Sequence, residues 1–528
     1  MTIQPTRPVP AELAARYVAE GWWPAHDRFD AIERVAAEAP DRLAVVDPWG
    51  RATYAELAVE VERMQGRLHA AGVGPGDVVG IVMPNWLHSV VLYHAALRRG
   101  AVVALMSTRI SVADLRSMAT ASRVNLLACP AGSDLTTAAE ALAADGTIRS
   151  VLHLDPTGEY DGAQIRRAPE VRLDMQAPAV VIFTSGSTAA AKGVVHSLAT
   201  LGAANRSLTQ RAGLDHNDVH FVVSPIAHIT GVMQGLHMPF DQGSTVVLSD
   251  RWDPVDAAEK IEAFGATFTG GAPVHLEGLM RVFGEWGRKS PLRVAVSGGA
   301  PMSSALIARA RDILGTRVMR VYGSTEFPFI SGTLADDDDD VSASSDGMVT
   351  PGTEVRAAES GELLARGPAL SLGYLNPQDT EDATLEGWLR TGDLADIDHG
   401  RLRIIGRQKE IAIRYGEKVS LAEVENALTG WAGCVEHGVY VVADAQTGER
   451  VGVAVRPVAG AQLTLAGMRA HLAGSGLATR KFPEEITEWR EPLPRTDSGK
   501  LARAALAQGA EERTLERAER LQATGPLT

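Results

Sequence analysis

Residues 180–197 combine hydroxyl side chains, a glycine and a lysine in a pattern typical of an anion-binding turn. An apolar run from Ala177 to Phe183 predicts a buried strand, after which the chain turns polar and reaches Lys192. Such a turn offers backbone N–H and side-chain O–H donors, and the lysine adds a positive charge. The sequence therefore predicts a site for a polyphosphate after the strand. The residues of this turn are Thr184, Ser185, Gly186, Ser187, Thr188 and Lys192.

This turn differs from the phosphate loop of P-loop NTPases. In that loop the lysine directly follows the second glycine, whereas here Lys192 precedes Gly193 and five residues separate Gly186 from Lys192. A surface turn of serine and threonine between two elements is the alternative interpretation. Residues further along the chain favour the functional interpretation.

Composition restricts the class of protein that could carry this turn. With 528 residues the chain exceeds what one hydrophobic core usually organises, so two or more domains are expected. A formal net charge of −14 disfavours binding to nucleic acid or to an anionic membrane. Cys129 and Cys434 have no metal-ligand spacing and predict no disulfide framework. With no apolar run of bilayer length and no apolar signal segment, we expect a cytoplasmic enzyme.

The strand before the turn belongs to a longer alternation of strand and helix patterns that continues to about Gly347. Tyr54–Ala70 has apolar residues at helical spacing and predicts an amphipathic helix, as do residues 86–99, Pro254–Phe264 and Ser303–Ile313. This alternation predicts an α/β fold with layered, mostly parallel sheets. The short apolar runs that predict its strands are Val78–Met83, Ala101–Leu105, Val124–Ala128, Val151–Leu154, Val219–Val223, Ser244–Leu248, Thr267–Thr269, Leu292–Ser297 and Arg317–Tyr322.

The last third of the chain has a different character. Short β-like pieces follow Gly347 and predict a small β-rich subdomain. Helix patterns at Leu421–Leu428 and Leu465–Leu472, with strand patterns between them, predict a separate α+β unit. The last residues, from Gly509 onward, are expected to form a charged helix or a frayed end. We therefore expect an N-terminal core over residues 1–406 and a small mobile C-terminal domain over residues 407–528.

Five further segments share the order of the motifs in one enzyme superfamily, and each contains glycine or charged residues suited to nucleotide chemistry. With them, nearly the whole chain resembles the adenylate-forming superfamily of acyl- and aryl-CoA synthetases, luciferases and peptide-synthetase adenylation domains. It is most similar to the cyclohexanecarboxylate-type acid:CoA ligases. The segments are Gly298-Gly299-Ala300-Pro301, Tyr322-Gly323-Ser324-Thr325-Glu326, Gly387-Trp388-Leu389-Arg390-Thr391-Gly392-Asp393, Gly406-Arg407-Gln408-Lys409 and Pro494-Arg495-Thr496-Asp497-Ser498-Gly499-Lys500.

The resemblance implies ATP-dependent activation of a carboxylic acid as an acyl adenylate, with Mg²⁺, followed by transfer to CoA. It implies that Glu326 binds Mg²⁺ and that Thr325 donates to the α-phosphate or the substrate carboxylate. Asp393 would accept from the ribose hydroxyls, and Lys500 would neutralise charge developing at the α-phosphate. The hydroxyl turn, with Lys192, would hold the β- and γ-phosphates. Further residues expected on the nucleotide side are Gly298, Gly299, Ala300, Tyr322, Gly323, Ser324 and Arg407.

The resemblance also implies rotation of the C-terminal domain about a hinge at Lys409 between two half-reactions. One pose brings Lys500 to the adenylation site, and the other presents the Ile411–Glu417 loop to a thiol. Gly416 lies where the family uses a glycine to let the pantetheine arm pass.

An acid-binding segment is suggested by Ser224–Gly231, in which His228 takes the position that gates the substrate carboxylate in the family. A buried core histidine is the alternative interpretation of His228. The expected pocket walls are small or apolar, which suits an uncharged aryl or alicyclic acid, and Arg414–Val419 is similar to the dihydroxybenzoate-AMP ligases. The wall residues are Gly231, Val232, Gly270, Gly271, Ala272 and Tyr322.

Two positions of the turn depart from the family pattern. Ala189 and Ala191 stand where the family usually has glycine and proline, and alanine restricts access to positive φ. Repurposed chemistry therefore stays open: transfer to a carrier-protein thiol or an amine, activation of nitrite for diazotisation of an aryl amine, or non-catalytic binding of an acyl adenylate. The sequence leaves open whether the protein is a monomer or a homodimer.

Overall fold

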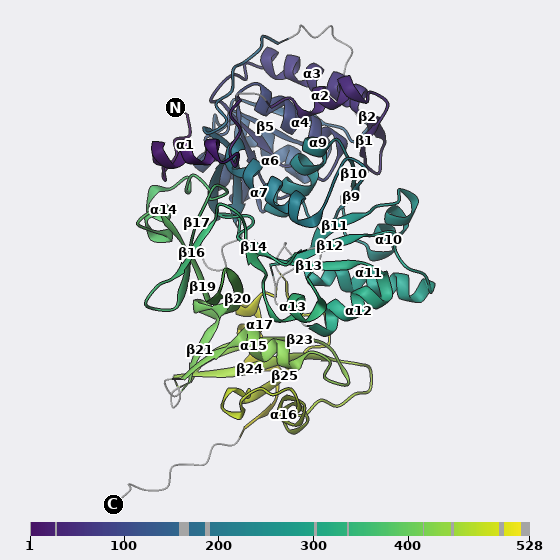
Figure 1. Cartoon of the computed structure of the whole chain (residues 1–528), viewed down its shortest axis with the longest axis vertical. Helices are drawn as coiled ribbons and strands as arrows, with labels where there is room; N and C mark the ends of the chain where they lie inside the picture. Colours follow the sequence, from purple (N-terminus) through teal and green to yellow (C-terminus); the bar gives the residue numbers. More distant parts are fainter. Residues whose placement is uncertain are drawn as a thin grey trace, which may run out of the picture.

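The computed structural model describes residues 2–26, 29–157, 168–184, 191–299, 302, 304–334, 337–414, 417–444, 448–495 and 501–518. Within these ranges the chain forms three β-sheets packed against helices (Figure 1). Two sheets lie in the part of the chain before residue 408, and the third lies in the green-to-yellow C-terminal part at the bottom of the view.

The first sheet contains the strand that leads into the hydroxyl turn. Its strands are parallel except for the last, which returns antiparallel to its neighbour. Side chains alternate between its faces, so Val79 and Ile81 enter one hydrophobic core while Val78 enters another. In spatial order the strands are β6 (Ser150–Leu154), β5 (Leu126–Pro130), β3 (Val78–Ile81), β4 (Val102–Leu105), β7 (Pro178–Thr184) and β8 (Lys192–Ser197).

The second sheet has a parallel half and an antiparallel half. The parallel half consists of β1 (Leu43–Val46), β10 (Thr245–Leu248), β9 (Val219–Val222), β11 (Phe268–Gly271), β12 (Val294–Gly298) and β13 (Arg317–Tyr322), with β2 (Arg51–Thr53) antiparallel at its edge. The antiparallel half is the predicted β-rich part. It consists of β14 (Ser331–Gly332), β15 (Met348–Val349), β20 (Arg401–Arg407), β19 (Trp388–Asp398), β17 (Glu362–Arg366) and β16 (Glu354–Ala357), with β18 (Thr384–Leu385) beside β19.

Helices bury both faces of the parallel half. Phe221 and Val247 pack in one core with α10 (Pro254–Ala263), α11 (Pro273–Trp286) and α12 (Ser304–Leu314). On the other face, Val222 and Leu248 share a core with residues of the π-helix η1 (Val232–His237). Near-continuous apolar strands are what burial on two faces requires. The helices that contribute to this second core or flank the first sheet include α2 (Ala31–Glu38), α3 (Tyr54–Ala70), α4 (Leu87–Arg98), α5 (Val112–Ser122), α6 (Asp134–Ala144), α7 (Leu198–Ala212), α8 (Ile229–Gly231) and α9 (Met238–Gln242).

The third sheet belongs to the C-terminal part of the chain. Its path is β22 (Glu417–Ser420), β21 (Ile411–Arg414), β24 (Gly448–Pro457), β25 (Glu485–Glu488) and β26 (Thr514–Arg517), with β23 (Cys434–Asp444) paired to β24. Helices α15 (Leu421–Leu428) and α16 (Leu465–Gly474) pack in one core, and α17 (Arg503–Arg513) packs in another. The remaining elements are α1 (Ala11–Ala19), α13 (Asp339–Ser344), α14 (Pro377–Ala383), η2 (Gln408–Glu410) and η3 (Thr479–Lys481).

The structure confirms the α/β class with layered sheets and helices, and strand pairing is mostly parallel in the first sheet and in the parallel half of the second. Helices α3 and α15 begin and end at the predicted residues. The interpretation of the chain from Gly509 as a charged helix or frayed end is wrong in part, because α17 ends at Arg513 and Thr514–Arg517 pairs with β25. The division into 1–406 and 407–528 stays a prediction. Within the described ranges, no helix is long and apolar enough to cross a membrane.

Candidate active site

The hydroxyl turn joins two strands of a hairpin, whereas a strand followed by a helix is the arrangement in P-loop proteins. Thr184 ends β7, Lys192 begins β8, and the two residues face each other in the ladder. The Thr184 hydroxyl donates to the Lys192 carbonyl oxygen at 3.4 Å. The other predicted phosphate-binding residues, Ser185, Gly186, Ser187 and Thr188, lie outside the described residues, as does Ala189.

Lys192 contacts two side chains that the sequence analysis did not identify. Its Nζ lies 2.8 Å from Asp379 Oδ1, at the start of α14, and 5.7 Å from the centroid of the Tyr374 ring. The Lys192 side chain is 41% exposed, so solvent screens the ion pair and its contribution to stability is small. Nothing in local sequence spacing connects these residues, because they come from distant segments.

Tyr374 joins Lys192 to the predicted Mg²⁺ ligand. Its hydroxyl donates to Glu326 Oε1 at 2.5 Å. Burial, with the nearby charge of Glu326, raises the pKa of Tyr374, so the phenol stays protonated and keeps donating. A cation and a carboxylate therefore both contact Tyr374. Within the described residues, no group of three or more histidine, cysteine, aspartate or glutamate side chains could hold a metal. A lone carboxylate suits Mg²⁺, which commonly completes its coordination with phosphate oxygens and water.

Thr325 is fixed through its backbone. His196, in β8, donates from Nε2 to the Thr325 carbonyl oxygen at 2.7 Å, and its Nδ1 lies 3.0 Å from Thr200 Oγ1. Burial lowers the pKa of His196 to about 4, so the ring is neutral at pH 7. His196 thus links the end of the hairpin to the segment that carries Thr325 and Glu326. His196 lies in the opening stretch of residues 180–197, but its position there predicts no such contact.

The predicted ribose ligand is buried among partners. Asp393 accepts a hydrogen bond on Oδ2 from the Tyr322 hydroxyl at 2.7 Å, and its Oδ1 lies 3.2 Å from Arg407 Nε. Burial, followed by the effect of Asp393, raises the pKa of Tyr322, which keeps the phenol a donor. The structure thus brings together three residues predicted from three separate motifs.

The glycine motifs lie at one edge of the second sheet. Gly298 ends β12 opposite Val321 of β13, and Gly299 follows it. Gly323 and Ser324 directly follow β13, and the Ser324 hydroxyl oxygen accepts from the Phe327 N–H at 3.3 Å. Because β12 and β13 are parallel, their carboxyl ends meet at this edge. Ala300 lies outside the described residues.

On the acid side, His228 caps the short helix α8. Its Nδ1 accepts from the Thr230 N–H at 3.3 Å. Gly231 is required by space, since a Cβ there would collide with the Pro225 carbonyl. Asn85, which the sequence analysis missed, holds the preceding loop: its Nδ2 donates to Ser224 O at 3.0 Å and its Oδ1 accepts from the Ile226 N–H at 2.8 Å.

Other expected wall residues lie in η1, in β11 and at the start of α11. Val232 begins η1 and is fully buried, while Gly270 and Gly271 end β11. Ala272 caps α11, and its N–H donates to His275 Nδ1 at 3.2 Å. Burial lowers the pKa of His275 to about 4, so this ring is neutral at pH 7.

The hinge region contains a second network. Arg407 ends β20 and Lys409 lies in η2. The next residue, Glu410, lies 3.3 Å from Arg503 Nε, and Arg503 also binds Glu425 and donates to the Val439 carbonyl at 2.6 Å. Arg503 thus ties the hinge to α17, which follows the predicted lysine loop. Lys500 and Gly416 lie outside the described residues.

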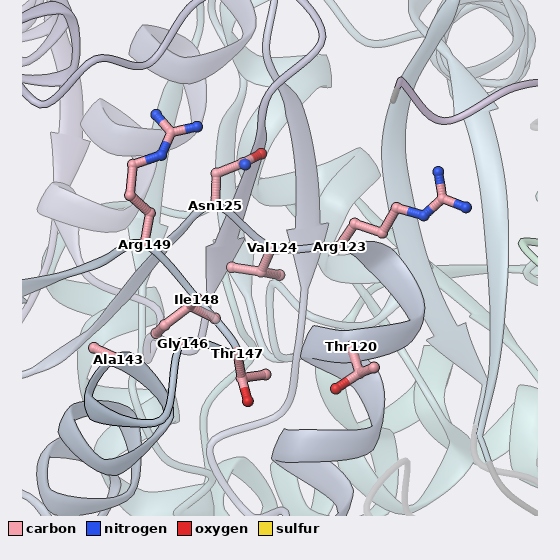
Figure 2. Close-up of a pocket in the computed structure, with 9 residues that line it drawn as sticks. All are labelled: Thr120, Arg123, Val124, Asn125, Ala143, Gly146, Thr147, Ile148 and Arg149. Atoms are coloured by element: carbon pink, nitrogen blue, oxygen red, sulfur yellow. The ribbon is translucent and has the colours of Figure 1, made fainter.

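A surface hollow of about 700 Å³ lies elsewhere (Figure 2). Asn125 and Arg149 line it just before β5 and β6 begin, whereas Thr184 lies at the carboxyl end of parallel β7. The hollow therefore opens at the opposite edge of the first sheet from the hydroxyl turn. Figure 2 shows the side chains of Arg123 and Arg149 extending away from each other, and Arg149 already pairs with Asp77 at 3.1 Å. This hollow is not part of the candidate site.

The described residues thus include Lys192 and Glu326, which both contact Tyr374, and a buried Asp393 held by Tyr322 and Arg407. The sequence matches the AMP-binding enzyme family over residues 32–375, and the chain belongs to that family. Triostin synthetase I of Streptomyces triostinicus is 30% identical over 94% of this chain and 97% of its own length.

Two other similarities point the same way. A salicylyl-CoA synthase / salicylate adenylyltransferase from a Streptomyces species is 28% identical over 96% of this chain and 98% of its own length. The ATP-bound structure of MatB from Rhodopseudomonas palustris superposes with a TM-score of 0.82 at 25% identity, covering 91% of this chain and 98% of that one.

These findings confirm the expected family and enzyme class: the chain is an AMP-forming acid–thiol ligase. They also support ATP, Mg²⁺ and CoA as the reactants and metal that the class uses. None of the relatives named above is named for nitrite chemistry, so the diazotisation alternative gains no support from them.

Proposed function

We propose that the protein activates a hydrophobic or aromatic carboxylic acid with ATP and then transfers the acyl group to CoA. The observation that supports this most is Tyr374, whose ring lies 5.7 Å from Lys192 Nζ and whose hydroxyl donates to Glu326 Oε1. A positive charge next to a carboxylate able to bind Mg²⁺ is what the departure of pyrophosphate requires.

In the first half-reaction a carboxylate oxygen of the acid attacks the α-phosphorus, and the bond from that phosphorus to the bridging oxygen breaks. The electron pair leaves with pyrophosphate. Lys192 and the turn residues Ser185, Ser187 and Thr188 would stabilise that leaving group, and Lys500 would neutralise the charge at the α-phosphate. Glu326 would hold Mg²⁺, which would supply a further positive charge to stabilise the phosphate groups.

The nucleotide would be oriented by the opposite side of the site. Asp393 is buried and already turned by Tyr322 and Arg407, so it can accept from both ribose hydroxyls without rearranging. Positioning of this kind contributes to the rate by fixing the α-phosphate in line with the attacking carboxylate.

In the second half-reaction the thiolate sulfur of CoA attacks the acyl carbon, a carbon–sulfur bond forms, and AMP leaves. We propose that residues 407–528 rotate about Lys409 between the two steps, which would withdraw Lys500 and bring Gly416 to the thiol. The Arg503 contacts with Glu410 and Glu425 support movement of the lysine loop and the C-terminal side of the hinge as one unit.

The experiment that tests the function measures pyrophosphate release with a panel of aryl, alicyclic and fatty acids and with nitrite plus an aryl amine, each with and without CoA. We expect release that depends on an organic acid, with formation of the acyl-CoA. Acid-dependent release without consumption of CoA would move the acceptor to a carrier-protein thiol or an amine. ATP binding without release for any partner would leave only a non-catalytic binder and refute the proposal.

A further inference from the structure

Gln234 lies on the acid side of the site in an unusual piece of backbone. It belongs to the π-helix η1, and its side chain is buried, with only 2% of the residue exposed. Single π-turns within helical segments occur frequently at functional sites, because the wider turn directs a side chain inward that an α-helix would place elsewhere. This π-helix could not be predicted from the sequence, since π-helices have no spacing signature.

The carboxamide of Gln234 rests on β11. A Cβ at Gly270 would collide with its amide group, so the glycine provides the space that the amide occupies. Gly270 is one of the residues expected to form the wall of the acid pocket. The Gln234 amide therefore lies over that wall.

One end of this amide is unsatisfied. Among the residues that the structure describes, none hydrogen-bonds to the buried Gln234 Oε1. The neighbouring strand residue behaves differently: the Thr269 hydroxyl donates to Phe221 O at 2.8 Å. A buried acceptor without a donor is costly, and most buried polar groups in proteins are paired. A polar group held in this way, beside a predicted pocket, is suited to a partner that arrives with a ligand.

We propose that Gln234 Oε1 accepts a hydrogen bond from a hydroxyl or amino group on the acid that this protein activates. This inference rests on the proposed function and deepens it. It specifies an aryl or alicyclic acid with a hydrogen-bond donor on its ring, where the small and apolar walls alone would suit the unsubstituted acid. A site that hydrogen-bonds a substrate donor discriminates against the analogue without it, because the acceptor is then left buried and unpaired.

The test measures binding, so that it does not depend on turnover. The probes are stable acyl-adenylate mimics, benzoyl-sulfamoyl adenosine and its ortho-, meta- and para-hydroxy and -amino derivatives, titrated calorimetrically into the full chain. We expect at least one donor-bearing isomer to bind about tenfold or more tightly than the benzoyl parent.

Three variants complete the test. Gln234→Leu should reduce that preference to about threefold or less by weakening only the donor-bearing probe, and Gln234→Glu, which keeps an acceptor, should retain it. Gln242→Leu is the matched control, since Gln242 donates to Thr209 Oγ1 at 2.9 Å and lies in α9. The Gln242→Leu variant should prefer the donor-bearing probe over the benzoyl compound by the same factor as the unsubstituted protein.

The outcomes separate this inference from the proposed function. An unchanged preference in Gln234→Leu, or equal binding of all probes by the parent protein, would mean that Oε1 meets only a buried water and would overturn the inference alone. Failure of every acid to support pyrophosphate release would refute the proposed function, whereas the calorimetric preference would still decide the role of Gln234. Thermal unfolding of each variant shows whether it is folded.

Discussion

The nucleotide side and the acid side of the candidate site differ in how their polar groups are satisfied. On the nucleotide side, Asp393 is paired with Tyr322 and Arg407, and Glu326 accepts from Tyr374. On the acid side, Gln234 Oε1 has no hydrogen-bond partner among the described residues, in a wall made largely of small and apolar residues. The polar groups of the nucleotide side are thus already oriented, whereas the acid side contains a buried acceptor that has no donor among the described residues.

This difference matches what each side has to recognise. Every turnover uses the same nucleotide, so fixed donors and acceptors reduce the reorganisation needed when it binds. The acid is the variable reactant, and a buried acceptor adds selectivity only when the correct acid supplies a donor. Substitutions on the nucleotide side should therefore lower rates for every acid, and substitutions on the acid side should change the ranking of acids.

Lys500 provides the largest expected effect, because in the proposed function it would supply the charge at the α-phosphate. Lys500→Ala should slow adenylation by about 10²–10³-fold while leaving thiol transfer from a supplied acyl adenylate nearly unchanged. Single-turnover measurements of each half-reaction check this, with the exposed Lys289→Ala as control. Equal losses in both steps would contradict the role assigned to Lys500.

Asp393→Ala should lower kcat/KM for ATP by about 100-fold, since it removes the proposed ribose acceptor and leaves Tyr322 and Arg407 without their common partner. The loss should be the same for every acid tested, in contrast to Gln234→Leu. Asp396→Ala is the control, because Asp396 lies in the same strand as Asp393 and forms an exposed ion pair with Arg403 of β20. A loss that varied strongly between acids would remove the distinction between the two sides.

Tyr374→Phe should raise the Mg²⁺ concentration needed for half-maximal adenylation by about tenfold or less, because Glu326 loses the hydrogen bond that orients it. The chain offers a matched control in Tyr440→Phe. The Tyr440 hydroxyl donates to Glu485 Oε1 at 2.7 Å in the C-terminal sheet, away from the site. Identical effects of the two substitutions would show that only stability had changed.

Asp379→Asn should change ATP binding by about fivefold at most, and in the direction of tighter binding. Asp379 pairs with Lys192, so removing its charge frees the ammonium for phosphate. The effect should fade at high salt, since Lys192 is 41% exposed. Weaker ATP binding would indicate that the pair holds Lys192 in its productive position.

The smallest effect at neutral pH is expected for substitution of His94, which is buried together with His237 near η1. Burial lowers the pKa of both His94 and His237 to about 3. The unfolded chain binds these protons near pH 6.5 and the folded chain does not, so stability should fall as the pH drops from about 6.5 towards 3. His94→Gln should unfold less steeply with acid in urea titrations, and the exposed His399→Gln should match the parent protein. If the stability of the unsubstituted protein and of both variants depended equally on pH, the neutral state assigned to His94 would be contradicted.

Much of the fold was predictable because its strands are short apolar runs bounded by turn residues, and α3 even has a capping box between Thr53 and Glu56. The prediction failed for Thr514–Arg517, a short charged segment whose strand conformation depends on pairing with β25. Such pairing leaves no periodic signal in the strand itself.

The residues of the candidate site likewise include some that were predictable from the sequence and others that were not. Asp393, Tyr322 and Arg407 were identified because each belongs to a motif with a recognisable order. Tyr374, Asp379, His196 and Asn85 were missed because their relevance arises from contacts between distant segments. Gln234 was missed for another reason: an unsatisfied atom is a property of three-dimensional packing and cannot be read from residue type.

The hairpin that carries the hydroxyl turn has a consequence for how such enzymes can diverge. Thr184 and Lys192 are register partners, so the seven residues between them start and finish at two points fixed by the sheet. Closing a loop between fixed ends costs little more when its length or composition changes. The whole segment can therefore be exchanged without disturbing the sheet. Replacing it with a glycine- and proline-containing counterpart from a relative should alter turnover while β7 and β8 keep their alignment.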